Sequence, residues 1–494
     1  MLKKTKEQVE NMSKSISTAL GHLYKVSDTE AKELVSLINE AITAINNTVI
    51  TYSNDIAVKS QELTGLLGNF TENKEKLQTV LNEYLTAINS IPKTYKVLFI
   101  AEMSSRWDAL ESVYHEFAKD TTFITEIVIA PVTRRRSKDS KVMFAQDYND
   151  YLTPLGIPHT LYEHYNIQND RPDIVFFCLP YNSDLPNNFH LSMVRRYSSY
   201  MVYIPYAAVV HRFEEKHLIS ESKVMDGAIL ARDTSDAFIA VGDFMVDDIN
   251  FVTGKKDKLI PLGSPKVDFL VNKKANNNWV RNPELERRFE GKTVFFLNTH
   301  FRQEVTGDEG FYDLLNFITD YFIINEDIAL IWRPHPNTFT FIGIQGEKYM
   351  KKTEEITKKM GSCPRIIIDM SPNHVSAFLY SHAVISHLSS IISLAVAIDK
   401  PTFVLDRYTN EQKEASQLIP STSLPCYGLK TNEPPNFNLI TQFITDIKNN
   451  NDTHKEERQR LCKYMFSNTN GTCGRAVYEY VKKEVLERDK QYAK

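Results

Sequence analysis

The sequence predicts an α/β fold in which two Rossmann-like domains face each other across a cleft, preceded by an α-helical segment. Three observations lead to this prediction. Apolar residues at helical spacing dominate the first part, apolar runs of strand length alternate with helical stretches beyond it, and a polar stretch divides that alternation in two. We therefore expect a helical bundle or coiled-coil segment over 1–92, domains over 93–272 and 292–475, and a helix over 476–494 that crosses back to the first domain.

Composition bounds the class of protein. At 494 residues the chain is too long for one core, so two or three domains are expected. Its apolar content of 42%, charged content of 24% and net charge of −4 are those of an ordinary globular protein with no general attraction to nucleic acid. No apolar run is long enough to span a membrane, and none follows the first residues as in a signal peptide. Five scattered cysteines without zinc spacing indicate a reduced, cytoplasmic setting.

The first 92 residues read as helices. Apolar residues recur at steps of three and four, which predicts three helices over about 4–24, 28–58 and 60–90. Ser27 and Glu30 form a capping box before the middle helix. The pattern supports equally a bundle packed on its own chain and a surface for homo-oligomerisation or a partner. A helix lying on a membrane is disfavoured because the polar faces mix acidic and basic residues.

Strand-like runs then organise two halves. The first half has them at 96–102, 126–130, 173–179, 201–204, 237–241 and 258–262, with a helix over 107–118. The second half has them at 293–297, 328–332, 365–369, 383–385 and 402–405, with helices over 310–323 and 346–360. Strands alternating with helices imply parallel sheets. Two such domains facing across a cleft make a GT-B architecture. A dinucleotide site of the usual kind is not expected, because the chain has no G-x-G-x-x-G.

Two stretches of the second half predict a phosphate site. Arg333-Pro334-His335-Pro336 follows the apolar run 328–332, and we expect its prolines to end the strand and hold Arg333 and His335 on a turn. Ser389 and Ser390 open an apolar helix, whose free N–H groups suit an anion. Each stretch also has an ordinary structural interpretation, as a turn whose histidine caps a carbonyl and as a helix N-cap.

Together the two stretches resemble the CDP-glycerol glycerophosphotransferases, which build teichoic acids and related polymers. The family has an RPHP-like segment, an I-T-D-Y-S-S-like segment matched here by Ile385 to Ser390, and a K-P dipeptide matched by Lys400-Pro401. Leu262 to Asp268 is similar to its G-x-P-R-x-D segment. The resemblance covers about 95–490 and is strongest between 260 and 405.

The chain departs from the family pattern in two places. His387 stands where the family has an aspartate. The family's W-H-G segment, which carries a proposed catalytic histidine, is absent, and 203–207 (Tyr-Ile-Pro-Tyr-Ala) stands in its place. The resemblance therefore implies the fold and the class of donor better than it implies the base.

The implied reaction is attack by an acceptor hydroxyl on the distal phosphorus of a CDP-activated polyol, which releases CMP. It needs groups that neutralise the diphosphate and a base near the hydroxyl. For the donor phosphates we expect Arg333, Ser389, Ser390, His387, Lys266, Arg302 and His300. For catalysis we expect His335 at the leaving phosphate and, as the base, His211 first, with Glu102 and Asp108 as rivals.

The expected partners and rival functions follow from the same resemblance. The partners are a CDP-linked donor and a glycan or polymer acceptor, lipid-linked in one interpretation, which would bring the protein to the inner face of the plasma membrane. No metal or other cofactor is expected, since the histidines show no i, i+4 pair.

One alternative is a GT-B glycosyltransferase or 2-epimerase that uses a nucleotide sugar, as in capsule synthesis. Another is a non-catalytic scaffold of a polymer-assembly complex, in which residues 1–92 recruit partners. A basic run, 134–138, could contact an anionic polymer or lipid, or be a solvated loop.

Overall fold

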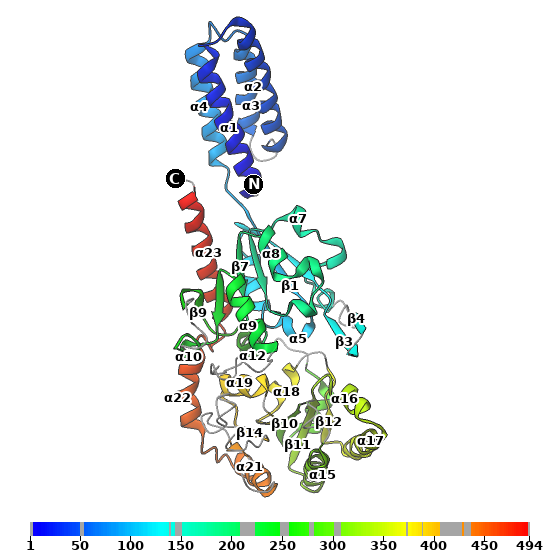
Figure 1. Ribbon diagram of the computed structural model, residues 1–494. Helices are drawn as coiled ribbons and strands as arrows, with labels where there is room; N and C mark the ends of the chain where they lie inside the picture. The colour runs from blue at the N-terminus through cyan, green and yellow to red at the C-terminus, as the bar shows by residue number, and fades with distance from the viewer. Residues whose placement is uncertain are drawn as a thin grey trace. The chain divides into compact units, whose positions relative to one another are not determined.

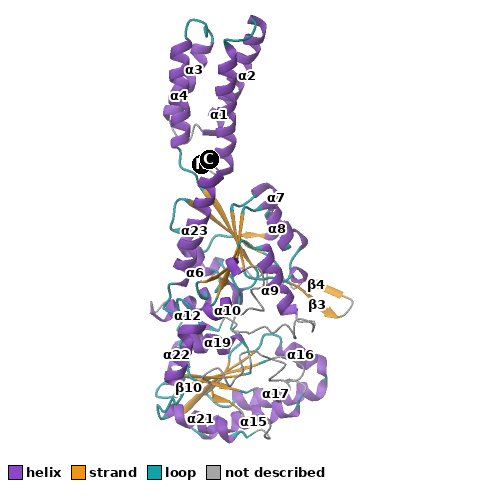
Figure 2. Cartoon of the chain, turned by 60° about the vertical axis from the view of Figure 1, so that its left-hand side comes forward, coloured by secondary structure: helices purple, strands orange, loops and turns teal. Residues whose placement is uncertain are grey.

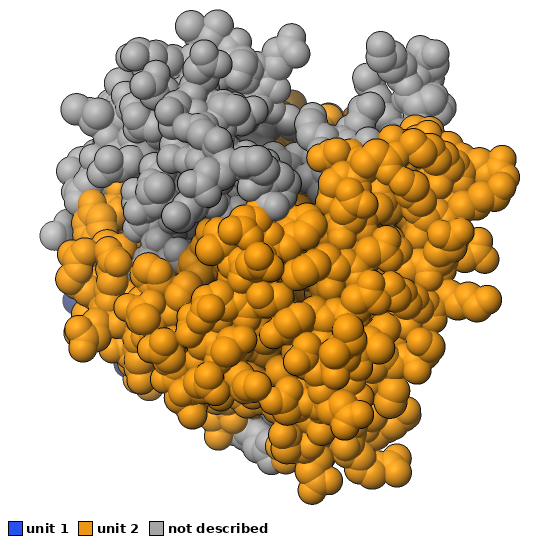
Figure 3. All heavy atoms as spheres, turned by 90° about the horizontal axis from the view of Figure 1, so that it is seen from below, with its two compact units in different colours: residues 1–98, 117–126, 172–174 blue, residues 99–116, 127–171, 175–494 orange. Residues whose placement is uncertain are grey.

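The structure is a computed structural model that falls into two compact units. Figure 3 shows a face of the molecule on which the second unit, drawn in orange, predominates over the first. Unit 1 holds 1–98, 117–126 and 172–174, and unit 2 holds the rest of the chain. The structure describes residues 3–49, 54–137, 140–143, 151–207, 223–247, 256–275, 281–300, 308–371, 374–387, 389–405, 427–428 and 436–492.

Unit 1 is built mainly from four helices (Figure 1). They are α1 (Lys3–Leu23), α2 (Asp28–Val49), α3 (Asn54–Leu67) and α4 (Lys74–Ser90). Their apolar faces form one core, which includes the buried side chains of Ile16, Ile38, Ile45, Leu63, Leu81 and Tyr84. The apolar residues that recur at helical spacing thus pack the four helices against one another.

The expectation of three helices was wrong. The stretch expected as one helix over 60–90 is divided between α3 and α4 by a turn over 68–73. Gly68 and Asn69 begin this turn, and both residue types are poor in helix interiors, so the break costs little. The capping box is confirmed, because Ser27 N donates to Glu30 Oε2 at 3.0 Å and Glu30 N donates to Ser27 Oγ at 3.4 Å.

The first sheet has seven strands in the order β5-β2-β1-β6-β7-β8-β9. Figure 2 draws the strands of the chain in orange. Its strands are β1 (Tyr95–Ala101), β2 (Phe123–Ile129), β5 (Thr160–Leu161), β6 (Ile174–Phe177), β7 (Tyr200–Tyr203), β8 (Ala237–Ala240) and β9 (Leu259–Pro261). All the strands expected in this half are confirmed, and β5 was too short to show a pattern. A separate hairpin pairs β3 (Thr133–Ser137) with β4 (Ser140–Met143). The helices are α5 (Ser104–Trp107), α6 (Glu111–Ala118), α7 (Ile167–Asp170), α8 (Leu191–Tyr197), α9 (Lys223–Thr234), α10 (Asp243–Asp247) and α12 (Pro265–Ala275).

A break replaces the single helix expected over 107–118. Ala109 N donates to Arg106 O and Leu110 N donates to Trp107 O, which are the bonds of a tight turn and not of an α-helix. Asp108 sits in this break, where its carboxylate is 2% exposed and bonded to Lys266. The long-range contact of Asp108 therefore competes with helix continuity, which local sequence does not reveal.

The second sheet has six strands in the order β12-β11-β10-β13-β14-β15, all in parallel pairs. They are β10 (Thr293–Thr299), β11 (Ile328–Pro334), β12 (Ile366–Ile368), β13 (Ala383–Ser386), β14 (Thr402–Val404) and β15 (Tyr427–Gly428). Its helices are α13 (Pro283–Phe289), α15 (Glu309–Ile324), α16 (Thr338–Gln345), α17 (Glu347–Gly361), α18 (Val375–Tyr380), α19 (Ser390–Ala397) and α21 (Asn438–Lys448). The core between them holds Phe295, Phe322, Trp332, Ile385 and Phe443. The expected helices and parallel strands of this half are confirmed.

The strand β11 extends further than predicted. Arg333 and Pro334 belong to it and pair with Asn298 and Thr299 of β10, so the prolines do not end it after Trp332. Trp332 O faces β12, where it accepts from Asp369 N, and successive residues of a strand face opposite neighbours. The backbone of Pro334 thus faces the same side as that of Trp332, toward β12, but at a level beyond the last residue of β12. Because no residue of β12 lies there to accept a hydrogen bond, the missing N–H of Pro334 costs no bond in the sheet.

The end of the chain packs on the first-sheet side of unit 2 through 465–474. Ser467 N donates to Val241 O at 2.9 Å, and Asn468 Nδ2 donates to Leu262 O at 2.9 Å. Gly263, at φ +101°, permits this approach, because a Cβ there would lie 2.1 Å from Ser467 O. Helix α22 (Lys455–Met465) leads into this crossing and α23 (Cys473–Tyr492) follows it.

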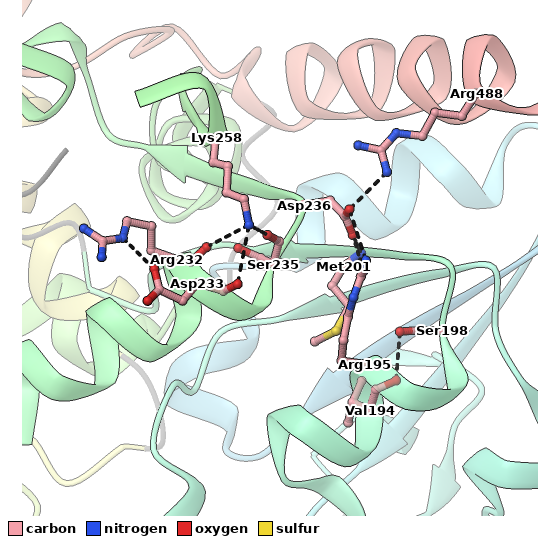
Figure 4. A network of polar contacts seen from close by, with 10 residues as sticks. All are labelled: Val194, Arg195, Ser198, Met201, Arg232, Asp233, Ser235, Asp236, Lys258 and Arg488. Carbon is pink, nitrogen blue, oxygen red and sulfur yellow. Dashed lines mark hydrogen bonds and ion pairs between the residues drawn. The ribbon is translucent and has the colours of Figure 1, made fainter. Parts of the chain in front are cut away.

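A polar network anchors α23 and closes α9 (Figure 4). Asp236 accepts from Arg195, from Met201 N at 2.9 Å and from Arg488 of α23 at 3.0 Å. Lys258 Nζ donates to Ser235 O at 2.7 Å, at the carboxyl end of α9, where a cation offsets the helix dipole.

Within the described ranges, no helix combines the length and apolarity needed to cross a bilayer.

Candidate functional site

The first group of candidate residues lies where the strand order of the first sheet reverses, between β1 and β6. Open parallel sheets bind ligands at this point, beyond the carboxyl ends of the strands. Glu102 follows β1, is fully buried, and accepts from Cys178 Sγ at 3.2 Å, just after β6. Burial raises the pKa of Glu102 to about 7, although the nearby Arg106 opposes the shift. Glu102 can therefore exchange a proton near neutral pH.

Aromatic residues flank this carboxylate. The Arg106 guanidinium lies 4.8 Å from the ring centroid of Tyr206, which belongs to the 203–207 segment. Tyr206 also bonds the hydroxyl of Tyr181, and burial raises the pKa of Tyr181 further above its ordinary value. Arg106 and the tyrosines of 203–207 thus lie near the end of this sheet. The 203–207 segment contains no histidine.

The second group lies at the reversal point of the second sheet, between β10 and β13. Asn298 Nδ2 donates to Ser386 Oγ at 2.9 Å and to Ser389 Oγ at 3.2 Å. Ser389 Oγ also accepts from Ile391 N at 3.3 Å, so Ser389 is the N-cap of α19 and Ser390 its first residue. His387 N donates to Asn298 O at 3.2 Å. An amide and hydroxyls therefore gather at the start of α19, where an anion would be favoured.

A third group joins the two sheet domains of unit 2. Lys266, at the start of α12, donates to Asp108 Oδ1 at 2.7 Å, and both side chains are buried. His374 precedes α18 on the second-sheet side, and its Nε2 lies 3.7 Å from Asp108 Oδ2. Burial is the main cause that raises the pKa of Asp108 to about 6, with Lys266 opposing it. Burial, Lys266 and Arg333 together hold the pKa of His374 well below its ordinary value.

Arg333 has protein partners of its own. Its Nη1 donates to Asp369 Oδ2 at 2.8 Å and to Ser371 Oγ at 3.1 Å, and its Nη2 donates to Ser371 O at 2.8 Å. Its charge still acts on His374. The guanidinium is thus fixed in orientation at the edge of β11, close to the third group.

Three histidines named from the sequence, His300, His335 and His387, each directly follow a strand. His335 N donates to Thr299 O at 3.0 Å, and the ring centroids of His335 and His300 are 5.6 Å apart. Asn337 N donates to His335 Nδ1 at 3.1 Å, so in the neutral ring Nε2 carries the proton. His387 lies 6.3 Å from Phe311, ring to ring. The ring of His335 can therefore donate from Nε2.

Three outcomes concern residues that the sequence named or missed. His211 and Arg302 lie outside the described residues. Asp108 and Lys266 are brought together, and His374, Arg106 and Asn298 were not among the candidates. His374 lies between β12 and α18, in a loop at the carboxyl end of a parallel strand, and this position could have marked it as a candidate. Among the described residues, no group of three or more His, Cys, Asp or Glu side chains is arranged to hold a metal ion.

Comparisons with known proteins establish the fold. No known protein family matches the sequence, and no curated protein matches it either. Solved structures do match. One is S. aureus MnaA with UDP, with a TM-score of 0.53 and 13% identity over 80% of this chain and 97% of that chain. Another is a putative UDP-N-acetylglucosamine 2-epimerase from Listeria monocytogenes, with a TM-score of 0.53 and 16% identity over 80% and 97% of the two chains.

The wall teichoic acid polymerase TagF is also similar. A TagF variant soaked with CDPG has a TM-score of 0.52 and 13% identity over 88% of this chain and 99% of that chain. The chain has the GT-B fold. At these identities the similarity concerns the arrangement of two Rossmann-like domains, and the predicted fold class is confirmed.

Proposed function

We propose that the protein transfers a polyol-phosphate group from a CDP-activated donor to a hydroxyl of a glycan or polymer acceptor, with release of CMP. The observation that carries the proposal is the third group, in which a buried aspartate is bonded to a lysine and faced by a histidine from the other sheet domain. These residues supply a base and cationic charge at one place, and the chemistry needs both. The GT-B fold, shared with TagF, supports the same class of reaction.

In this proposal the residues act as follows. Asp108 accepts the proton of the attacking hydroxyl, since a carboxylate with a pKa near 6 is ionised at neutral pH and still basic. Lys266 keeps that carboxylate in place. Asn298, Ser389 and the start of α19 bind the donor phosphates, and His335 donates from Nε2 to the leaving phosphate. Arg333 contributes charge from its fixed position.

Glu102 is the second candidate for the base. It is buried and has a pKa of about 7, so it too can accept a proton. The variants Asp108→Asn and Glu102→Gln separate the two roles, because loss of the base lowers the rate by about 10²- to 10⁴-fold and loss of a neighbouring carboxylate by less.

The test is turnover of CDP-glycerol. Purified protein is incubated with CDP-glycerol, UDP-N-acetylglucosamine or a CMP-sugar, with and without a glycerol-phosphate oligomer, and released nucleotide is measured. CMP formation that increases with the oligomer supports the proposal. If the protein turns over only a sugar nucleotide, the proposal is rejected in favour of the nucleotide-sugar alternative. The similarity to MnaA with UDP supports that alternative.

The scaffold alternative is tested in cells. If His335→Ala leaves polymer formation unchanged while deletion of 1–92 abolishes it, the protein acts without catalysis. If His335→Ala abolishes polymer formation and folded protein is still present, the catalytic proposal holds.

A further inference from the structure

Two buried polar atoms in the third group face each other without a partner. Among the described residues, neither Asp108 Oδ2 nor His374 Nε2 has a hydrogen-bond partner. Their side chains are 2% and 7% exposed. Leaving such atoms unsatisfied destabilises a folded protein, so their pairing with a ligand would be favourable.

The distance between these atoms is too long for a direct bond and suits one bridging atom. They lie 3.7 Å apart, whereas N–H···O bonds are about 2.7–3.2 Å long. An oxygen placed about 2.8 Å from each atom could bond both. The contact is not an ion pair either, because the lowered pKa of His374 leaves its ring neutral at pH 7.

The hydrogen-bonding character of the pair selects the ligand group. Lys266 occupies Asp108 Oδ1, so Oδ2 remains as an acceptor. A neutral imidazole with its proton on Nε2 offers a donor. A hydroxyl, of a ligand or of water, both donates to a carboxylate and accepts from an N–H, whereas an unprotonated phosphate oxygen could only accept.

We propose that Asp108 and His374 together bind the attacking hydroxyl of the acceptor, and that His374 is a further catalytic residue of the transfer. The hydroxyl donates to Asp108 Oδ2 and accepts from His374 Nε2–H, which leaves its second lone pair for attack on phosphorus. As the new P–O bond forms, the O–H proton passes to Asp108. The P–O bond to CMP breaks, and CMP leaves with that electron pair.

The position of His374 supports this role. Its ring lies 5.4 Å from the ring of Phe378 in an edge-on arrangement, which fixes its orientation. It belongs to the second-sheet side, whereas Asp108 belongs to the first, so the hydroxyl site is complete only when both sides are in place. The charged groups that act on the pair are Lys266, Arg333 and Glu111.

The inference rests on the proposed function, and the experiment separates the two. Wild-type protein is first assayed for CMP release from CDP-glycerol with a glycerol-phosphate oligomer as the acceptor. Absence of both CMP release and CDP-glycerol binding overturns the proposed function, and the hydroxyl assignment is rejected with it. If wild-type protein transfers, the variants His374→Leu and His374→Gln decide the role of His374.

His374→Leu removes the donor and is expected to lower kcat/KM for the oligomer by about tenfold or more, with KM for CDP-glycerol changed less than about twofold. His374→Gln keeps an N–H donor and is expected to recover part of that loss. The control is His382→Gln, which replaces an exposed histidine just before β13 whose Nδ1 accepts from Val294 N. It is expected to lower Tm without changing kcat/KM.

Two results would overturn the role of His374. One is a His374→Leu protein with unchanged kcat/KM for the oligomer. The other is a result in which both His374 variants change kcat/KM for the oligomer and KM for CDP-glycerol to the same extent and lower Tm as much as the control does. That result would show that His374 has a structural role only.

Discussion

At the residue scale, the third group is a case of buried charge held by one strong partner. Asp108 has a single hydrogen-bonded cation, Lys266, at 2.7 Å. Burial nevertheless outweighs this attraction, because the pKa of Asp108 rises from 3.8 to about 6. Burying the Asp108 carboxylate therefore lowers the stability of the fold, as is common for ionisable groups in functional sites.

The raised pKa of Asp108 predicts how stability depends on pH. Because the folded-state pKa lies above the unfolded value, Asp108 favours the folded state at low pH, and this contribution is lost as pH rises from about 4 through 6. Wild-type protein should therefore lose about 1 kcal/mol of unfolding free energy relative to Asp108→Asn between pH 5 and pH 7.5. Urea denaturation at the two pH values measures this difference.

Asp327→Asn is the control, since its carboxylate is exposed and bonded to Lys448, which lowers its pKa. That variant should show no such relative loss over the same pH interval. A relative stability of wild type and Asp108→Asn that does not change with pH would contradict the buried position of Asp108.

The same shift predicts the pH dependence of catalysis. If Asp108 is the base, kcat/KM rises with pH through about 6 and then levels, because only the carboxylate accepts the proton. A pH–rate profile of CMP release measures this limb. In Glu102→Gln the limb should stay near pH 6, and a limb that disappears in that variant would transfer the role to Glu102.

At the element scale, the start of α19 and the crossing at 465–468 depend on few residues. Ser389 caps α19 and is held by Asn298. Ser389→Ala should cost about 1 kcal/mol through loss of the cap. It should also raise KM for CDP-glycerol several-fold if, as we propose, the same hydroxyl binds the donor phosphates. Denaturation and initial rates measure the two effects.

Two outcomes bear on the role of Ser389. Ser389→Thr, which keeps a capping hydroxyl, should recover most of the stability. A Ser389→Ala protein that is destabilised but binds CDP-glycerol normally would leave Ser389 as a helix cap alone.

The crossing segment closely approaches a glycine that cannot be replaced without strain. In Gly263→Ala the Cβ would meet Ser467 O at 2.1 Å, and φ is +101°, so we expect a loss of about 2 kcal/mol or more. Gly156→Ala, with a positive φ of +69° and open space around it, should lose about 1 kcal/mol. Thermal unfolding compares the two, and equal losses would argue against the close approach of 467 to Gly263.

The motif around Gly263 combines three separate roles. Gly263 admits the crossing segment, Lys266 bonds Asp108, and Asp268 accepts from Cys473 N at 3.1 Å and Gly474 N at 2.6 Å at the start of α23. A short sequence motif thus holds both the candidate site and the returning end of the chain.

At the scale of the whole molecule, the four helices of unit 1 share one core of their own. We predict that 1–92 produced alone is helical and unfolds cooperatively, since about 90 residues can bury enough apolar surface for marginal stability. Circular dichroism during heating measures this. Ile45→Asp, at a fully buried position, should abolish the transition, and a chain of 1–92 that is unfolded without any substitution would contradict the prediction.

The sequence by itself determined the alternation of strands and helices, the helical first segment and the fold class. These follow from local hydrophobic periodicity, which is written into neighbouring residues. It also pointed to His300, Arg333 and Ser389, because parallel strands bring their carboxyl ends to one edge of a sheet.

Only the tertiary structure decided which of these side chains meet. Asp108 and Lys266 are 158 positions apart in the chain, and their bond, like the approach of His374 to Asp108, arises from how the sheets and their helices pack. The continuation of β11 through Pro334 likewise depends on where the neighbouring strand ends. Periodicity describes what each element buries, but contacts between distant elements, and the pKa values they shift, exist only once the chain is folded.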